Sequence, residues 1–249
     1  MTRIGAVSIA TAPFAALGGQ AAKLGLHLTD AQIGQCGAYA AALIETNRSV
    51  NLTAITDPDA IALKHFLDSF TAYAARPWTG HERLVDVGSG AGFPGLALAI
   101  ALPGLAVTCV EATGKKARAI ESFAGLLGIR AQVLHARAEE VVRDQRQRAR
   151  HDVATARALG SLAHCAELLL PFLKVGGDAI AWKGRIDAEL PAAERALAAI
   201  GGEIAAVVPT ASFGLGEELP GRHLVVMRKT RATPDRYPRT PADMKRRPW

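Results

Sequence analysis

Short apolar runs alternate with longer segments of helical periodicity from about residue 81 to residue 230. Strands that are separated by helical segments of roughly 10–15 residues indicate βαβ units and a parallel sheet. Only a loop separates the last two predicted strands, 204–208 and 223–228, so we expect these two to pair antiparallel. The pattern therefore predicts an α/β fold whose mostly parallel sheet ends in an antiparallel hairpin. The earlier strands are predicted at 84–87, 107–110, 133–135, 153–155 and 179–182.

Amphipathic patterns at 30–46 and 58–75 precede this region and predict N-terminal helices. Further helices are predicted at 94–102, 115–127, 138–149, 161–173 and 187–199. The chain is therefore divided into a leader that we expect to be flexible (1–28), a helical region (29–80), a main domain (81–230) and a basic tail (231–249).

Composition places the chain among folded globular proteins, since 49% of its residues are hydrophobic and 21% are charged. Cys36, Cys109 and Cys165 include no CxxC pair, so we expect neither a disulfide framework nor a metal site. The mildly apolar run at 4–17 is broken by polar residues and Pro13, and no run reaches the roughly 18 residues of a membrane helix. We therefore expect a cytoplasmic monomer with no membrane contact and no stable protein partner.

The net charge of +6 lies in the last part of the chain. Residues 228–249 contain eight basic and two acidic residues, which account for the whole excess. A short basic arm is suited to contacts with phosphate groups, so we predict that the tail binds RNA. A tail that only increases solubility is the alternative. The candidate RNA contacts in the tail are Arg236, Arg239, Lys245, Arg246 and Arg247.

The segment 85–95 carries the strongest signal for a ligand site. It follows a predicted strand, opens a helix and contains four glycines, three of them at alternate positions from Gly88, which let a ligand lie against the backbone. Glu111 ends the next strand, 23 residues after Gly88. A carboxylate in this place can accept hydrogen bonds from both hydroxyls of a ribose. The candidate cofactor contacts in and beside the loop are Asp86, Gly88, Ser89, Gly90, Gly92 and Phe93.

The spacing of the glycines distinguishes between nucleotide cofactors. A dinucleotide fold requires GxGxxG, but Phe93 stands where the third glycine would be. S-adenosylmethionine has no pyrophosphate and carries a cationic amino group and a sulfonium, which an acid such as Asp86 suits. We therefore expect S-adenosylmethionine rather than NAD.

Short motifs besides the glycine loop occur in order along residues 29–249: Asn51-Leu52-Thr53, His65–Ser69, Gly114-Lys115-Lys116, Arg137–Glu140, Arg157-Ala158, Trp182-Lys183-Gly184, Arg222–Val226 and Tyr237-Pro238-Arg239. Together they resemble the bacterial small-subunit rRNA guanine-N7 methyltransferases, also called glucose-inhibited division protein B. The resemblance implies a class I methyltransferase Rossmann-like fold.

The resemblance also implies a site. Gly88 and Phe93 would contact the cofactor, Glu111 would hold its ribose, and Ala138 and Glu139 would flank its adenine. Arg157, after the fourth strand, would face the cleft between cofactor and target. The alternatives are that Arg157 pairs with a nearby acid, and that Glu139 only stabilises a helix N-terminus.

The implied substrate is guanine 527 in the 530 loop of 16S rRNA. Guanine N7 carries a free lone pair at neutral pH, so we expect no essential general base, and Arg157 would place the target or the cofactor. Lys115, Lys116, Arg118 and Lys183 are further candidate RNA contacts, although the first three can equally form a solvated helix face.

Three other functions stay open from the residues alone. A small-molecule methyltransferase is the main alternative, and it would not need the basic tail. An NAD-dependent oxidoreductase lacks its third glycine here. A non-catalytic RNA-binding protein can share the fold, although the intact loop and Glu111 argue against it.

Overall fold

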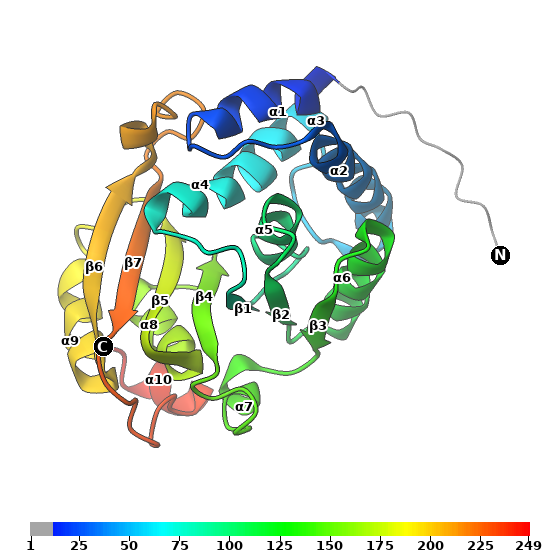
Figure 1. The fold of residues 1–249 in the computed structure, drawn as a ribbon. Helices are drawn as coiled ribbons and strands as arrows, with labels where there is room; N and C mark the ends of the chain where they lie inside the picture. The colour runs from blue at the N-terminus through cyan, green and yellow to red at the C-terminus, as the bar shows by residue number, and fades with distance from the viewer. Residues whose placement is uncertain (1–11) are drawn as a thin grey trace.

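The computed structural model describes residues 12–249, which form a seven-stranded sheet with helices on both faces (Figure 1). The strands are β1 (Arg83–Val87), β2 (Ala106–Val110), β3 (Ala131–Leu134), β4 (His151–Arg157), β5 (Leu173–Lys183), β6 (Gly202–Pro209) and β7 (His223–Lys229). Their order is β3-β2-β1-β4-β5-β7-β6; the first five are parallel, and β7 is antiparallel to both β5 and β6. The predicted sheet, including its terminal hairpin, is confirmed.

Helices occupy the predicted regions with some changes of length. The helix predicted at 58–75 consists of two α-helices joined by a π-helical turn. The helices are α1 (Ala12–Ala22), α2 (Asp30–Val50), α3 (Pro58–Ile61), η1 (Ala62–Leu67), α4 (Asp68–Ala75), α5 (Gly95–Ala101), α6 (Gly114–Leu127), α7 (Ala138–Val141), α8 (Leu162–Leu169), η2 (Leu170–Phe172), α9 (Leu190–Ile200), η3 (Thr210–Phe213) and α10 (Pro241–Arg246).

Each face of the sheet has its own hydrophobic core. Side chains alternate along a strand, so Leu84 of β1 packs in the cluster that includes residues of α2, α5 and α6, whereas Val85 and Val87 pack with α8 and α9. Among the described residues, no helix is long and apolar enough to cross a membrane. The loops that follow the parallel strands lie at one edge of the sheet, which we call the carboxyl edge. Strands β4 and β5 begin at the opposite edge, which we call the amino edge.

The expectation of a flexible leader is wrong for residues 12–28. Helix α1 places Phe14, Leu17 and Ala21 in the core, where each is at most 2% exposed. Phe14 meets Phe66 edge to face, with ring centroids 5.8 Å apart. The described part of the mildly apolar run at 4–17 therefore packs on the helical layer, and residues 1–11 lie outside the described part.

The helix predicted at 138–149 is also too long. Helix α7 ends at Val141, and the chain continues in turns up to residue 149. Residues 143–146 offer no apolar side chain to bury, and the Asp144 carboxylate accepts from the Arg146 N–H at 2.9 Å, which favours a local turn. The helix propensity of residues 143–146 is therefore not sufficient to extend α7, because this segment has no apolar face to bury.

Candidate active site

A cavity of about 650 Å³ opens at the carboxyl edge, where β1, β2, β4 and β5 end. Its size is within the range of small-molecule sites. Gly88, Ser89, Gly90 and Phe93 from the glycine loop line one side of it. A smaller pocket of about 140 Å³ shares Gly88 with the main cavity and is lined by Ala138 and Glu139 among others. The predicted cofactor residues from three strand ends are therefore brought together.

Glu111 has a fixed orientation in this cavity. The residue is 7% exposed, and its carboxylate accepts hydrogen bonds from two backbone N–H groups, those of Gly90 at 3.0 Å and Thr113 at 2.7 Å. Each carboxylate oxygen has a second lone pair for another donor. The two backbone N–H groups thus fix the orientation of the Glu111 carboxylate at the cavity.

Asp86 and Gly92, in contrast, do not line the cavity. Asp86 is fully buried, and its carboxylate accepts from the Gly95 N–H at 3.1 Å and the Thr155 hydroxyl at 2.8 Å. Burial raises the pKa of Asp86 to about 6, although these hydrogen bonds oppose the shift. Asp86 therefore fixes the start of α5 from below the loop, and the expectation that it faces a cofactor cation is not met.

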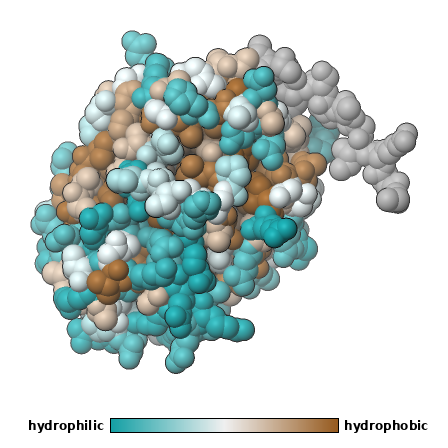
Figure 2. Space-filling model, in the orientation of Figure 1, coloured by the Kyte–Doolittle hydropathy of each residue, from teal (hydrophilic) through white to brown (hydrophobic). Residues whose placement is uncertain are grey.

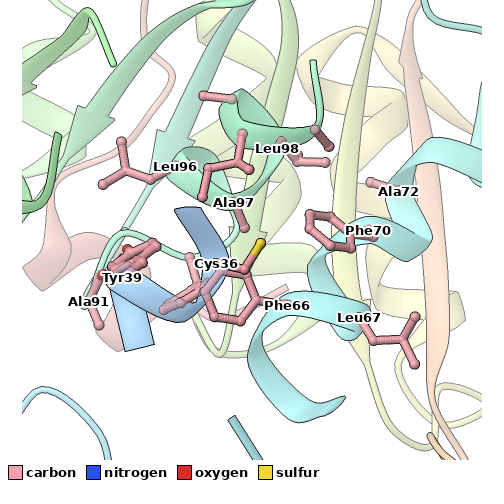
Figure 3. Packing of buried hydrophobic residues seen from close by; sticks show 14 of the residues in the cluster. Cys36, Tyr39, Phe66, Leu67, Phe70, Ala72, Ala91, Leu96, Ala97 and Leu98 are labelled. Carbon is pink, nitrogen blue, oxygen red and sulfur yellow. Dashed lines mark hydrogen bonds between the residues drawn. The ribbon is translucent and has the colours of Figure 1, made fainter. Parts of the chain in front are cut away.

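Gly92 is required by packing rather than by a ligand. Its φ is +90°, and a Cβ there would lie 2.4 Å from the Tyr39 hydroxyl oxygen. That hydroxyl donates to the Ala91 carbonyl, and Figure 3 shows the two residues side by side in the core. The tyrosine of α2 thus supports the loop from the helical layer.

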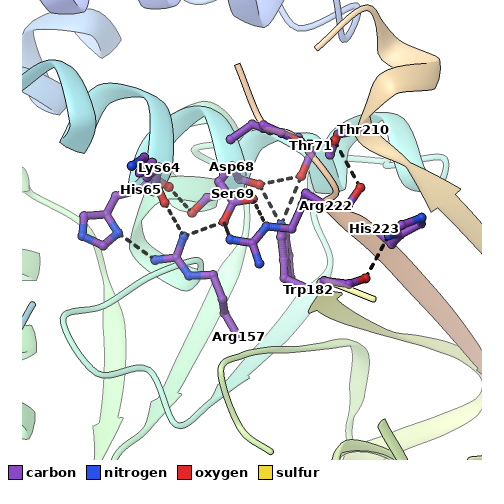
Figure 4. Close-up of polar contacts among 12 residues, drawn as sticks. Lys64, His65, Asp68, Ser69, Thr71, Arg157, Trp182, Thr210, Arg222 and His223 are labelled. Atoms are coloured by element: carbon purple, nitrogen blue, oxygen red, sulfur yellow. Dashed lines mark hydrogen bonds and ion pairs between the residues drawn. The ribbon is translucent and has the colours of Figure 1, made fainter. Parts of the chain in front are cut away.

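Arg157 lies in a buried network of charged groups at the end of β4 (Figure 4). Its guanidinium donates to the Lys64 carbonyl and to the Asp68 carboxylate, both at 3.0 Å, and to His65 Nδ1 at 3.0 Å. Arg222 Nε lies 2.9 Å from the same carboxylate, whose side chain is fully buried. Arg157 therefore pairs with an acid, Asp68 at the start of α4, and it also lines the cavity. The two interpretations of Arg157 are compatible, and its role toward cofactor or target stays a prediction.

This network fixes the protonation of His65. A guanidinium has only donors, so Nδ1 must accept, and Nε2 carries the proton that faces Thr53 Oγ1 at 2.9 Å. Burial, and secondarily the charge of Arg157, lower the pKa of His65 to about 3. The neutral ring stacks on Phe93, with centroids 4.8 Å apart and planes 16° from parallel. His65 and Phe93 together form a rigid, uncharged part of the wall.

Comparisons with known proteins identify the family. A family model, GidB, described as rRNA small subunit methyltransferase G, matches residues 32–215. The chain is 44% identical over 234 residues to the ribosomal RNA small subunit methyltransferase G of Roseiflexus castenholzii, covering 92% of this chain and 96% of that protein. The protein of the same name from Halalkalibacterium halodurans is 39% identical over 226 residues, 90% of this chain and 94% of that protein. The chain belongs to the rRNA small subunit methyltransferase G family.

Membership in the methyltransferase G family confirms the resemblance seen in the motifs and makes the chain an rRNA methyltransferase. Among solved structures, that of MtNAS in complex with MTA and tNA has a TM-score of 0.51 at 16% identity and covers 77% of this chain and 71% of that one. At this identity the likeness supports the fold alone.

The basic residues predicted to contact RNA fall into different environments in this methyltransferase. Lys116 lines the cavity, whereas Lys115 and Arg118 point to solvent and do not. Lys183 lines it too, but its ammonium already donates to the Gly160 carbonyl at 2.7 Å and pairs with Glu189 at 2.8 Å. Five cations and two carboxylates line the cavity: Lys64, Lys116, Arg157, Lys183 and Arg222 against Glu111 and Glu189.

Lys64 and Arg222 were not among the predicted site residues. Arg222 stands in one of the quoted family motifs, which was the signal that could have identified it. Trp182, which stands in another of these motifs, is 2% exposed and donates its indole N–H to the Asp68 carbonyl at 2.7 Å. It is therefore part of the supporting wall.

The predicted basic arm of the methyltransferase is folded against the amino edge. The guanidinium of Arg239 binds the Glu167 carboxylate of α8 through Nε at 2.8 Å and Nη2 at 2.6 Å. Trp249 donates its indole N–H to the same carboxylate at 2.6 Å. The tail thus lies across the sheet from the cavity, and Arg239 is not free to bind RNA. Arg236, Lys245, Arg246 and Arg247 stay exposed.

Proposed function

We propose that this methyltransferase transfers a methyl group from S-adenosylmethionine to N7 of guanine 527 in the 530 loop of 16S rRNA. Family membership supplies rRNA methylation. The observation that carries the assignment to this cavity is the meeting of Glu111, the glycine loop and the Arg157 network at one edge of the sheet. Ligands of open α/β sheets bind at this edge. The family favours this function over the small-molecule alternative.

The residues present fit the cofactor. Glu111 has lone pairs directed to the cavity for the two ribose hydroxyls, and the backbone of Gly88 to Gly90 borders the same space. The side pocket beside Ala138 and Glu139 is the proposed place of the adenine. When bound, S-adenosylmethionine would supply an electrophilic methyl group. Glu139 is 8% exposed, so a hydrogen bond that its carboxylate accepts from the amino group of the base would be well shielded from water.

No general base is needed for the reaction that we propose. N7 of guanine attacks with a lone pair that is free at neutral pH, so alignment and exclusion of water account for catalysis. His65 is held neutral by burial and Arg157, and the Asp86 carboxylate lies below the loop. Arg157 is therefore assigned a positioning role: it fixes the wall formed by His65 and Phe93.

The rim of the cavity is the proposed primary contact with rRNA. Three more cations than carboxylates line it, and such an excess attracts phosphate groups. Lys64 and Lys116 are the proposed phosphate contacts, while Lys183 is held by Glu189 and Arg222 by Asp68. We further propose that the enzyme acts as a monomer in the cytoplasm, and that the exposed tail cations contribute only at a distance from the target base.

The direct test is methyl transfer from labelled S-adenosylmethionine to small ribosomal subunits that lack the modification, followed by nucleoside mass spectrometry. We expect 7-methylguanosine at one position, 527, and none when position 527 is changed to adenine. A label at another nucleoside, or at no nucleoside although the cofactor binds, would refute the assigned target.

A further inference from the structure

A second basic cavity, of about 390 Å³, lies at the amino edge of the sheet. Three cations and one carboxylate line it: Arg148, Arg150, Lys229 and Asp235. The tail passes beside it, and in Figure 2 hydrophilic side chains gather over this lower part of the visible face. The length of β4 separates the two edges, which corresponds to about 20 Å for seven residues. This cavity is therefore distinct from the candidate active site.

Lys229 is the unusual residue of this cavity. It is 2% exposed, and its ammonium donates to the Leu173 carbonyl at 2.7 Å. Within residues 12–249 no carboxylate lies within ion-pair distance of it. A buried ammonium is normally paired with an acid, because burial without a counter-charge is costly. Burial, and secondarily the charge of Arg148, lower the pKa of Lys229 to about 8, so an anion here would relieve both effects.

The neighbours of Lys229 do not supply that anion. Arg148 donates to the carbonyls of Thr233 and Tyr237 at 3.1 and 2.9 Å, which hold its positive charge beside the cavity. The single carboxylate, Asp235, has a fully exposed side chain 3.6 Å from Arg148 rather than from Lys229. Thr233 is 8% exposed, and its buried hydroxyl has no hydrogen-bond partner in the described part of the chain. The cavity therefore holds more positive charge and more donors than its own residues satisfy.

We propose that this cavity binds a phosphate group, with Lys229 as its central contact and Arg150 at its mouth. The same chemistry can come from a phosphate of the rRNA backbone or from a free phosphate compound. The first source rests on the proposed function and would make RNA recognition bipartite, with contacts at both edges of the sheet. The second would make the cavity an independent ligand site.

Calorimetric titration with inorganic phosphate at pH 7 tests the site without any assay of activity. We compare the full chain with Lys229→Met, with Arg150→Gln and with the control Arg48→Gln, which removes an exposed arginine on α2. Because hydrogen bonds to buried charges are strong, Lys229→Met is expected to weaken binding at least about tenfold. Arg150→Gln should weaken it about two- to fivefold, and Arg48→Gln should leave it unchanged.

Affinity for small-subunit rRNA at several salt concentrations separates the two sources. If the ligand is a backbone phosphate, Lys229→Met lowers the affinity and reduces the slope of log K against log salt by about one. If Lys229→Met impairs only the binding of inorganic phosphate, the ligand is a free phosphate compound. Phosphate binding that is absent, or equal in Lys229→Met and the parent, overturns the proposal whatever the methylation assay shows.

Discussion

Two buried carboxylates of this chain are both held by arginines, at opposite edges of one sheet. Asp68 is gripped by Arg157 and Arg222, and Glu167 by Arg239; both acid side chains are fully buried. The first group forms the wall of the cavity at the carboxyl edge. The second fastens the tail to α8, with Trp249 as a further donor. We call this second group, Glu167 with Arg239 and Trp249, the clamp.

The comparison shows that an arginine-rich segment cannot be assigned a function from its charge alone. The tail has the higher density of basic residues, yet the buried partner of Arg239 belongs to the packing of α8. Arg157 has no basic neighbour in the sequence, yet its guanidinium donates hydrogen bonds to Lys64, His65 and Asp68 at the cavity wall. Whether a buried ion pair supports the candidate active site or only fastens the tail therefore depends on where its acid lies in the fold.

The largest expected effect follows from removing the charge of Asp68. Asp68→Asn leaves two arginines beside a neutral amide in a buried position, which typically costs about 3–5 kcal/mol. Unfolding in urea should show this loss, together with loss of methyl transfer. A loss of less than about 1 kcal/mol in the free energy of unfolding would mean that solvent, rather than Asp68, compensates the positive charges of Arg157 and Arg222.

The next effect separates the site from the clamp. Arg157→Lys keeps the charge but cannot contact Lys64, Asp68 and His65 together, so the wall beside Phe93 is misplaced. We expect the rate of methyl transfer to fall about 100-fold, the scale of a misplacement near 1 Å. Single-turnover assays, with cofactor binding measured separately, check this. Full activity in Arg157→Lys would show that positive charge alone is required.

The clamp should fail in the opposite way. Glu167→Gln weakens the bonds from Arg239 and Trp249 and should lower the free energy of unfolding by about 1.5–3 kcal/mol, while methyl transfer stays within about threefold. Burial opposes ionisation of Glu167, but the bonds from Arg239 and Trp249 outweigh it, so the pKa lies below its usual value.

A depressed carboxylate pKa fixes the pH dependence of this difference. The contribution of Glu167 is fully present above the unfolded pKa, about 4.3, and is lost as pH falls through the folded value. The gap in stability between the parent and Glu167→Gln should therefore be constant from pH 8 to 5 and shrink below about pH 4. A gap that persists in acid would exclude the ion pair as its cause.

The smallest effect concerns His65. Because its pKa is about 3, the ring stays neutral and the pH profile of methyl transfer should show no inflection near 6.5. The unfolded chain binds a proton below about pH 6.5, so the share of stability due to His65 is present above that pH and falls towards pH 3. NMR titration of the ring checks this, and a midpoint near 6.5 would contradict the network.

The sequence predicted the features that are encoded locally. The strands, their mostly parallel pairing and the terminal antiparallel pair followed from alternating patterns, and the link between Gly88 and Glu111 followed from their spacing across one βαβ unit. The tail could not be placed in this way, because Arg239 and Glu167 are 72 residues apart and only tertiary packing joins them. Asp86 was misassigned for a related reason: its partners Gly95 and Thr155 close over it only in the folded sheet.

The central claim is that methyl transfer belongs to the carboxyl edge and that the tail is a structural clamp. Methylation of small ribosomal subunits by Arg157→Lys and Glu167→Gln, measured beside the free energy of unfolding of each, tests it most directly. The account predicts that Arg157→Lys loses mainly activity and Glu167→Gln mainly stability. Equal loss of activity in both variants, at a temperature where both are folded, would contradict it.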